Sequence, residues 1–443
     1  MLVLNSRLGR ITIASLVAGL LIGIVGGLFE LLLVLANSLR NEVVARAHAW
    51  PYLGWLIPLL LVLTGAVLAR LMVLRFSPEA AGSGLQRVEA VFAGEVKAAS
   101  MAVLPVKFFG GLLAIGSGLA LGREGPMAQM GASVATLTSR FLIRNDAVAK
   151  VIDAAGAGAG IAVAFNAPIG GSIFVFEELT SSFTPWLLVA TLAAAVTAVW
   201  CMRMIIGNHF DFTVTQVRSL PAYLLWPFLM LGVLLGIVGA AYNWTIVRLL
   251  RLTDHLARLS SVQWAMLIGG SIGLIAWFAP SLVGGGDNLT QLVLAGRYTV
   301  PVLAVIFGLR FFLGPWSYAA GTPGGLFAPM LVLGASFGAL FGQTVAHFYP
   351  SLGVSPVGCA VVGMATLFSA CVRAPLTGIV LTVEMTGRGD LTLAMLGSAL
   401  AAIVVSMLLD SEPIYETLKR QMLERQALTD KAAAKLKATA PTV

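Results

Sequence analysis

Charged side chains are scarce in this sequence of 443 residues. Only 11% of the residues are Asp, Glu, Lys or Arg, whereas soluble domains contain about a quarter. The chain is 58% hydrophobic, and its mean hydropathy is +0.92. This composition excludes an ordinary soluble domain and predicts an all-α polytopic membrane protein.

Cysteine and histidine are also rare, and neither is spaced as in a metal site. The cysteines stand far apart in apolar surroundings, which favours small buried side chains over disulfides or redox chemistry. We expect no metal and no cofactor. An enzyme that uses a membrane glutamate as base is the least favoured function, because no nucleophile–base pair or HExxH helix accompanies it. The residues concerned are Cys201, Cys359, Cys371, His48, His209, His255 and His347.

Apolar segments of membrane-spanning length recur from end to end. Some are too short, too long or too broken by Gly and Pro to be simple spans, as expected where helices stop inside the membrane and line a protected cavity. The first is too long for a signal-peptide core, so we expect it to remain as a span. The segments are 11–36, 54–74, 101–121, 125–142, 151–180, 186–206, 221–249, 264–283, 299–320, 326–346, 355–385 and 391–409.

The formal net charge of +8 comes from basic residues in short loops and at the termini. This distribution follows the positive-inside rule and does not indicate nucleic-acid binding. It predicts that both chain ends lie on the cytoplasmic side. Residues 416–443 are expected to form a short basic cytoplasmic tail, a helix that frays, with no room for a regulatory domain. The basic residues include Arg7, Arg10, Arg140, Arg144, Lys150, Lys419, Arg420, Arg425, Lys431, Lys435 and Lys437.

Glu124 lies in a short polar motif between long apolar stretches, so we expect its carboxylate at membrane depth. An ionisable group there is costly and therefore marks a functional site. The neighbouring glycines free the backbone, and the proline is suited to a helix start. N–H groups at a helix start attract negative charge, so the carboxylate and a passing anion would compete for one position, as in a gate. The motif is Gly122, Arg123, Glu124, Gly125 and Pro126.

Two halves of the chain, 1–215 and 216–415, repeat one pattern of residues. Such repeats build many transporter folds, with the substrate site at the repeat interface near the midplane. If the halves are inverted, the helix starts after Gly122 and Gly325 converge, and their partial charges form an anion site weak enough to release its ion. Phe108, Gly122, Pro126 and Gly131 recur 203 residues later as Phe311, Gly325, Pro329 and Gly334. Ala167, Pro168, Gly171 and Glu177 recur 207 residues later as Ala374, Pro375, Gly378 and Glu384, and Gly82-Ser83-Gly84 has a weaker echo in Gly284-Gly285-Gly286.

Three signatures in this order resemble those of the chloride channel and transporter (CLC) family. The resemblance covers about residues 10–420, and stretches 104–111 and 164–168 look particularly like bacterial proton/chloride exchangers. The signatures are Gly82-Ser83-Gly84-Leu85-Gln86 for GSGIP, Gly122-Arg123-Glu124-Gly125-Pro126 for GREGP, and Gly325-Leu326-Phe327-Ala328-Pro329 for GxFxP. Gln86 replaces the family's proline, which relaxes the turn and adds an amide near the ion path. The resemblance implies that Ser83 favours chloride over nitrate, because nitrate-preferring members of the family often carry proline at this position.

The resemblance implies a fold of about eighteen tilted and partial helices in two inverted-topology repeats. It also implies a homodimer with a separate ion pathway in each subunit. The family's chloride ligands map to the hydroxyls of Ser83 and Tyr415 and to the backbone N–H groups of Leu326 and Phe327. Arg123 is expected to hold local structure rather than to touch the ion. Lys107 either adds positive potential at one entrance or snorkels to the membrane interface.

Glu178 decides between an exchanger and a passive channel, because it matches the family's inner proton-transfer glutamate. Glu177 pairs with Glu384 across the repeat, whereas Glu178 pairs with Met385, so Glu177 is expected to be structural and Glu178 functional. We expect an antiporter in which deprotonated Glu124 substitutes for chloride and Glu178 passes protons to it. The alternative is a passive voltage- or pH-gated chloride channel. A bacterial inner membrane is the expected location.

Overall fold

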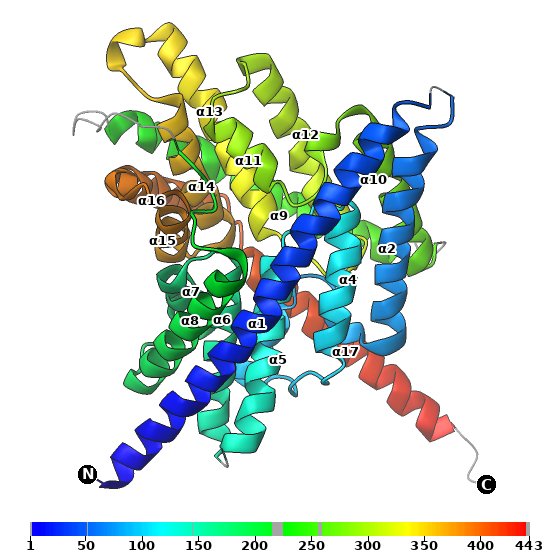
Figure 1. Cartoon of the computed structure of the whole chain (residues 1–443), viewed down its shortest axis with the longest axis vertical. Helices are drawn as coiled ribbons and strands as arrows, with labels where there is room; N and C mark the ends of the chain where they lie inside the picture. The colour runs from blue at the N-terminus through cyan, green and yellow to red at the C-terminus, as the bar shows by residue number, and fades with distance from the viewer. Residues whose placement is uncertain (1, 51, 144, 215–224, 256–258, 440–443) are drawn as a thin grey trace.

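The computed structural model describes residues 2–50, 52–143, 145–214, 225–255 and 259–439. This part of the chain folds into seventeen α-helices that cross one another at varied tilts (Figure 1). The only β-type pairing in it consists of two isolated bridges, Gly82 with Pro323 and Gly122 with Gly325. The expected all-α architecture is confirmed.

Residues 215–224 are not among the described residues, so the expected repeat boundary at 215/216 lies outside the described part of the chain, and the helices are grouped here by the half in which they lie. The first group is α1 (Leu2–Ala47), α2 (Leu56–Phe76), α3 (Leu85–Ala93), α4 (Val103–Ser117), α5 (Glu124–Leu142), α6 (Asp146–Ala164), α7 (Pro168–Phe174), a π-helical turn (Val175–Leu179) and α8 (Pro185–Ile206). The second group is α9 (Leu225–His255), α10 (Ser261–Phe278), α11 (Asp287–Leu294), α12 (Val300–Tyr318), α13 (Phe327–Phe348), α14 (Pro356–Val372), α15 (Pro375–Thr386), α16 (Thr392–Leu408) and α17 (Ile414–Thr439). Short 3-10 turns occupy Pro78–Ala80, Pro280–Leu282, Pro350–Leu352 and Gly389–Leu391.

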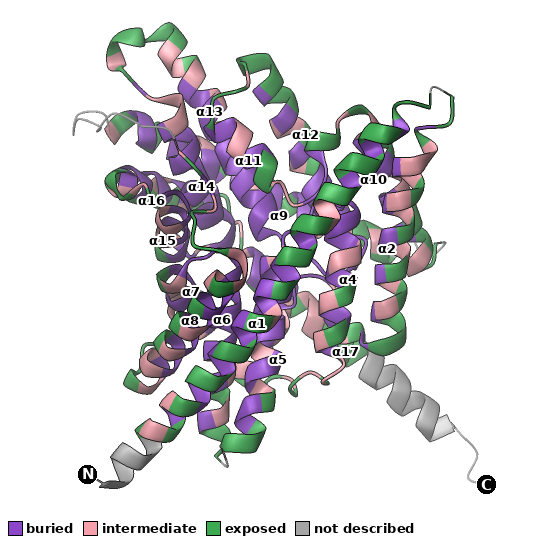
Figure 2. Cartoon of the chain, viewed as in Figure 1, coloured by how far each residue is buried: buried purple, intermediate pink, exposed green. Residues whose placement is uncertain are grey.

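Nine of the described helices are long and apolar enough to cross a membrane. Their outer faces carry exposed large apolar side chains such as Leu35, Trp200 and Leu400, while nearly all of α14 is buried (Figure 2). An apolar surface around a buried centre is the distribution that a bilayer requires. Where helices pack most closely, glycines meet: a Cβ on Gly334 of α13 would lie 2.2 Å from the carbonyl oxygen of Gly363 in α14.

Two of the long apolar segments each fold as two helices. Segment 151–180 divides between α6 and α7 at Asn166, and segment 355–385 divides between α14 and α15 at Arg373. Both residues have a positive φ, 49° and 72°, so neither can continue the preceding helix. In each case an Ala-Pro pair follows, and the proline starts the next helix. The breaks are 207 residues apart, as in the sequence repeat.

Both ends of the chain lie on one side of the molecule, which we call the terminal side (Figure 1). The helix α1 starts there and runs to the opposite, far side, where its end at Ala47 leads toward α2. The helix α17 starts in the interior with Tyr415 buried and runs out to the terminal side. The tail expected after residue 416 is therefore helical through Thr439.

Candidate functional site

The starts of α5 and α13 meet in the interior of the molecule. The N–H group of Gly122 donates to the carbonyl of Gly325 (2.9 Å), and the N–H group of Gly325 donates back to Gly122 (2.7 Å). These repeat-related glycines therefore join the two helix starts directly. Neither start has a side-chain cap, so the first N–H groups of both helices direct positive partial charge at one region.

The carboxylate of Glu124 occupies this region. The side chain is only 1% exposed, and its Oε2 has no hydrogen-bond partner. The backbone N–H groups of Glu124 itself and of Ala328, from α5 and α13, lie beside the carboxylate. A Cβ on Gly122 would lie 2.0 Å from Oε2, so the close approach of the carboxylate needs glycine there. The acid thus stands where two helix N-termini favour an anion.

Ser83 and Tyr415 approach the same point from different elements. Both side chains are buried, and neither hydroxyl oxygen has a hydrogen-bond partner. A Cβ on Gly125 would lie 2.2 Å from Oγ of Ser83, so α5 passes directly over the Ser83 loop. The ring of Tyr415 packs on that of Phe327, with centroids 5.6 Å apart. The structure therefore brings Ser83, Tyr415, Phe327 and Glu124 together, and the two free O–H groups are donors suited to an anion.

Lys107 lies beneath the Ser83 loop rather than at the membrane interface. It is 0% exposed, and its Nζ donates to the carbonyl oxygens of Gly82 (2.7 Å) and Ser83 (2.9 Å). The snorkelling interpretation is therefore wrong. By holding both carbonyls, the lysine fixes the backbone of the loop and adds positive potential behind it.

Arg123 is held by acids and a carbonyl, as expected for a structural residue. Its Nε donates to the carbonyl of Ala164 (3.0 Å), and its Nη atoms lie 3.2 Å from Glu30, 3.6 Å from Asp211 and 3.7 Å from Asp287. Burial raises the pKa of Asp211 to about 7, although Arg123 lowers it. Three acids surround this guanidinium and offset part of the positive potential that it also exerts on Glu124.

Glu177 and Glu384 cap each other's helices across the repeat. The carboxylate of Glu177 accepts from the N–H groups of Leu376 (3.0 Å) and Thr377 (2.7 Å) at the start of α15. The carboxylate of Glu384 accepts from Ile169 (3.2 Å) and Gly170 (2.6 Å) at the start of α7. The structural role expected for Glu177 is confirmed.

Glu178 differs from its neighbour because it accepts none of these capping bonds. It sits on the π-helical turn, half-buried, and its charged neighbours include Glu89, Glu416 and Lys419. Lys419 of α17 pairs with Glu89 of α3 at 2.5 Å. Glu178 is therefore a free acid between the interior and the terminal side. The Glu89–Lys419 pair joins residues 330 apart and was not predicted from the sequence.

Two large cavities lie on opposite sides of the site. The terminal-side cavity is lined by residues of the Ser83 loop and by three arginines: Gly82, Gly84, Gln86, Tyr318, Arg70, Arg87 and Arg425. Gln86 of the first signature therefore lines this cavity. The far-side cavity is lined by Arg40, Arg123, Asp211, Gly285 and Asp287. A small pocket at Glu124 shares Arg123, Gly285 and Asp287 with it.

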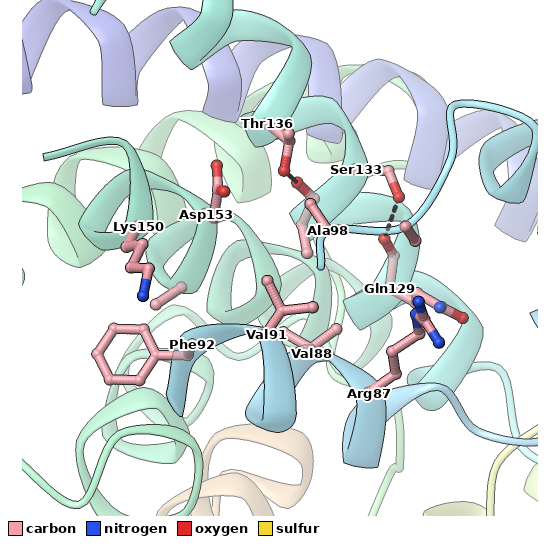
Figure 3. Close-up of a pocket in the computed structure, with 13 residues that line it drawn as sticks. Arg87, Val88, Val91, Phe92, Ala98, Gln129, Ser133, Thr136, Lys150 and Asp153 are labelled. Atoms are coloured by element: carbon pink, nitrogen blue, oxygen red, sulfur yellow. Dashed lines mark hydrogen bonds between the residues drawn. The ribbon is translucent and has the colours of Figure 1, made fainter. Parts of the chain in front are cut away.

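A separate pocket lies between α3, α5 and α6 (Figure 3). Val88, Val91 and Phe92 form one wall, and Lys150 and Asp153 of α6 face them. None of the residues at the meeting of α5 and α13 lines it, so it is not part of the anion site. Among the described residues, no group of three or more His, Cys, Asp or Glu side chains could hold a metal ion.

Comparison with known proteins places the chain in a family. The family model for the voltage gated chloride channel matches residues 65–407. The H(+)/Cl(-) exchange transporter ClcA of Cronobacter sakazakii is 37% identical over 432 residues, 94% of this chain and 92% of the relative, and ClcA of Vibrio cholerae is 38% identical over 426 residues, 94% and 91%. The crystal structure of a slow cyanobacterial Cl-/H+ antiporter aligns with a TM-score of 0.91 at 32% identity, covering 94% of this chain and 99% of that one. The chain belongs to the voltage-gated chloride channel (CLC) family.

Proposed function

We propose that this protein exchanges chloride for protons across a membrane, with Glu124 as the gate. The observation that carries the proposal is the carboxylate of Glu124 at the joined starts of α5 and α13. Deprotonated Glu124 holds the anion position as a tethered substitute for chloride. Protonation removes its charge, the side chain swings away, and chloride takes the vacated N–H groups.

Chloride binds next to this position, between Ser83 and Tyr415. Their buried hydroxyls lack partners and supply two donors. The backbone N–H groups of Leu326 and Phe327, at the uncapped start of α13, supply the others. The site contains dipoles and hydroxyls but no unmatched cation in direct contact, so it releases its ion readily.

Protons take a path that differs from the chloride path on the terminal side. Glu178 passes them between solvent and Glu124, and its free carboxylate beside the Glu89–Lys419 pair supports this role. Chloride enters instead through the terminal-side cavity past Gln86. Chloride and protons therefore move in opposite directions. The relatives named as H(+)/Cl(-) exchange transporters support exchange over a passive channel.

The terminal side faces the cytoplasm in this proposal, because basic residues gather at both chain ends and in the 140–150 loop. The chain works as a homodimer in a bacterial inner membrane. Its two membrane repeats are 1–215 and 216–415, followed by the short tail 416–443.

The decisive experiment uses purified protein in liposomes with a chloride gradient and a proton electrode outside. Potassium and valinomycin hold the voltage where no proton leak is driven. The wild type should move protons uphill. Glu178→Ala should stop proton movement and keep chloride flux, and Glu124→Ala should leave chloride flux that no longer responds to pH. Chloride flux without linked protons in the wild type would make the protein a channel, and full coupling in Glu124→Ala would refute the gate.

A further inference from the structure

The loop before α3, which carries Ser83, has a repeat counterpart on the far side. Gly84 caps α3 with a φ of 85°, and Gly286 caps α11 with a φ of 105°. Each loop's first glycine is anchored by the other half: Gly82 N–H donates to Thr322 and Gly284 N–H donates to Gly118. The two loops therefore have the same backbone shape, one facing each cavity.

A buried base lies beneath each loop. Lys107 donates to Gly82, and Arg310, 203 residues later, donates through Nη1 to Gly284 (2.9 Å). Arg310 is only 1% exposed, and its Nε and Nη2 have no hydrogen-bond partner. Nη2 lies 2.6 Å from where a Cβ on Gly286 would stand, so the unpartnered side of the guanidinium points at the loop.

A second guanidinium reaches the same loop from α1. Arg40 is 8% exposed, and its Nη1 lies 2.8 Å from where a Cβ on Gly284 would stand. It donates to neutral oxygens of Asn37 (2.9 Å) and Asn41 (3.1 Å), and no described carboxylate pairs with it. Arg40 therefore brings an unmatched positive charge to the wall of the far-side cavity.

The acids of this cavity do not neutralise that charge directly. Glu30 and Asp211 lie against Arg123. Asp287 is half-exposed and lies 3.7 Å from Arg123, and its Oδ2 is 3.7 Å from where a Cβ on Gly285 would stand. Its carboxylate thus hangs over the loop, as Glu124 does over Gly122. His48 and His209 also line the cavity.

We propose that the loop 284–287 is a second binding site, for a monovalent inorganic anion, at the far-side mouth. The first N–H groups of α11, which have no intrahelical acceptors, and Arg40 contact the anion. Arg310 supplies positive potential from beneath, and the carboxylate of Asp287 competes for the place. That the natural ligand is chloride rests on the proposed function, whereas the site itself does not.

The test uses bromide as the probe with the full-length protein. Anomalous diffraction from bromide-soaked crystals should show a peak at loop 284–287 as well as one beside Ser83. Arg40→Gln should lose the first peak and keep the second, and Asp287→Asn should strengthen the first. Ser38→Ala, a neutral change in the same cavity, should alter neither. Absence of the peak at loop 284–287 in the wild type would overturn the proposal. A peak there that neither Arg40→Gln nor Asp287→Asn alters would also overturn it, because it would identify an adventitious ion only.

Transport assays test the same site independently, with one variant that should weaken anion binding and one that should strengthen it. Arg40→Gln removes one charge-assisted contact, so the far-side chloride concentration for half-maximal flux should rise about ten-fold. Asp287→Asn should lower it, and the exposed position of Asp287 keeps this test available if Arg40→Gln fails to fold. Neither variant should shift the terminal-side value. Equal shifts on both sides would contradict the proposal, while uncoupled flux in the wild type would refute only the exchange function.

Discussion

The reciprocal caps of Glu177 and Glu384 predict a loss of both stability and proton coupling in Glu177→Gln. The glutamate accepts three hydrogen bonds from α15, one from Leu376 and two from the N–H and hydroxyl of Thr377. Glutamine keeps one acceptor oxygen, but its NH₂ group must face a backbone N–H. Because Glu178 is the next residue on the same π-helical turn, releasing this anchor should also move Glu178.

The magnitude follows from the bonds lost. A hydrogen bond to a charged group contributes about 1.5–3 kcal/mol, and the exchange removes at least one such bond together with the charge at a helix start. We therefore expect a destabilisation of about 2–3 kcal/mol, which lowers Tm by about 2–5 °C in a chain of this size. Tryptophan fluorescence of the detergent-purified protein during heating measures it. Proton flux in liposomes should fall further than chloride flux.

Glu384→Gln is the matched control. It removes the equivalent cap from α7, but Met385 follows it, so no transport residue is displaced. We expect a similar or smaller loss of Tm, because Glu384 accepts two bonds rather than three. Chloride and proton flux should change in proportion. If Glu177→Gln melts like the wild type, or if both variants lose proton coupling equally, the assigned division between structural Glu177 and functional Glu178 is wrong.

Two further predictions test the anion site and its surroundings. Gly125→Ala places a methyl group 2.2 Å from Oγ of Ser83, an overpacking that costs about 1–3 kcal/mol. Chloride affinity measured by calorimetry should therefore fall about ten-fold. The control Gly308→Ala, whose Cβ would have nothing within 4 Å, should leave the affinity unchanged. Burial raises the pKa of Asp211 from 3.8 to about 7, so the folded state binds this proton more tightly than the unfolded state does. The protonated carboxyl therefore adds to the free energy of unfolding at low pH, and this contribution is lost as the pH rises from 4 to 7. The Tm of Asp211→Asn minus that of the wild type should therefore increase between pH 5 and pH 7.5. If the two Tm–pH profiles run parallel, the raised pKa of Asp211 is wrong.

The sequence was sufficient to predict what depends on local pattern. Some apolar segments were expected to be too long or too broken for simple spans, and segments 151–180 and 355–385 indeed divide, each before a helix that starts with the proline of an Ala-Pro pair. The meeting of Gly122 and Gly325 was expected on the condition that the two halves are inverted, and the paired hydrogen bonds between these two glycines agree with that condition. The unequal partners of Glu177 and Glu178 in the repeat separated a capping acid from a free one.

Contacts between distant segments could not be predicted from the sequence. Lys107 looked equally suited to an interface, and only the fold shows that the carbonyls of Gly82 and Ser83 stand where its ammonium ends. The short helices α3 and α11 fall outside the list of apolar segments because they are half polar and eight or nine residues long. The role of Arg310 could in principle have been predicted, since it is the repeat partner of Lys107. Both residues hold a glycine loop from beneath, but the repeat of that loop is only weakly visible in the sequence.

The arrangement of full charges explains how one carboxylate can control an anion path. Arg123 adjoins Glu124, and an unmatched guanidinium there would trap chloride; instead it faces three acids, Glu30, Asp211 and Asp287. The ammonium group of Lys107 likewise has local partners, because it donates to the backbone carbonyls of Gly82 and Ser83. What remains at the anion position is N–H dipoles and two hydroxyls, whose attraction is comparable for a chloride ion and for a tethered carboxylate. Occupancy then depends on the protonation of Glu124, and a single proton decides whether the position is open.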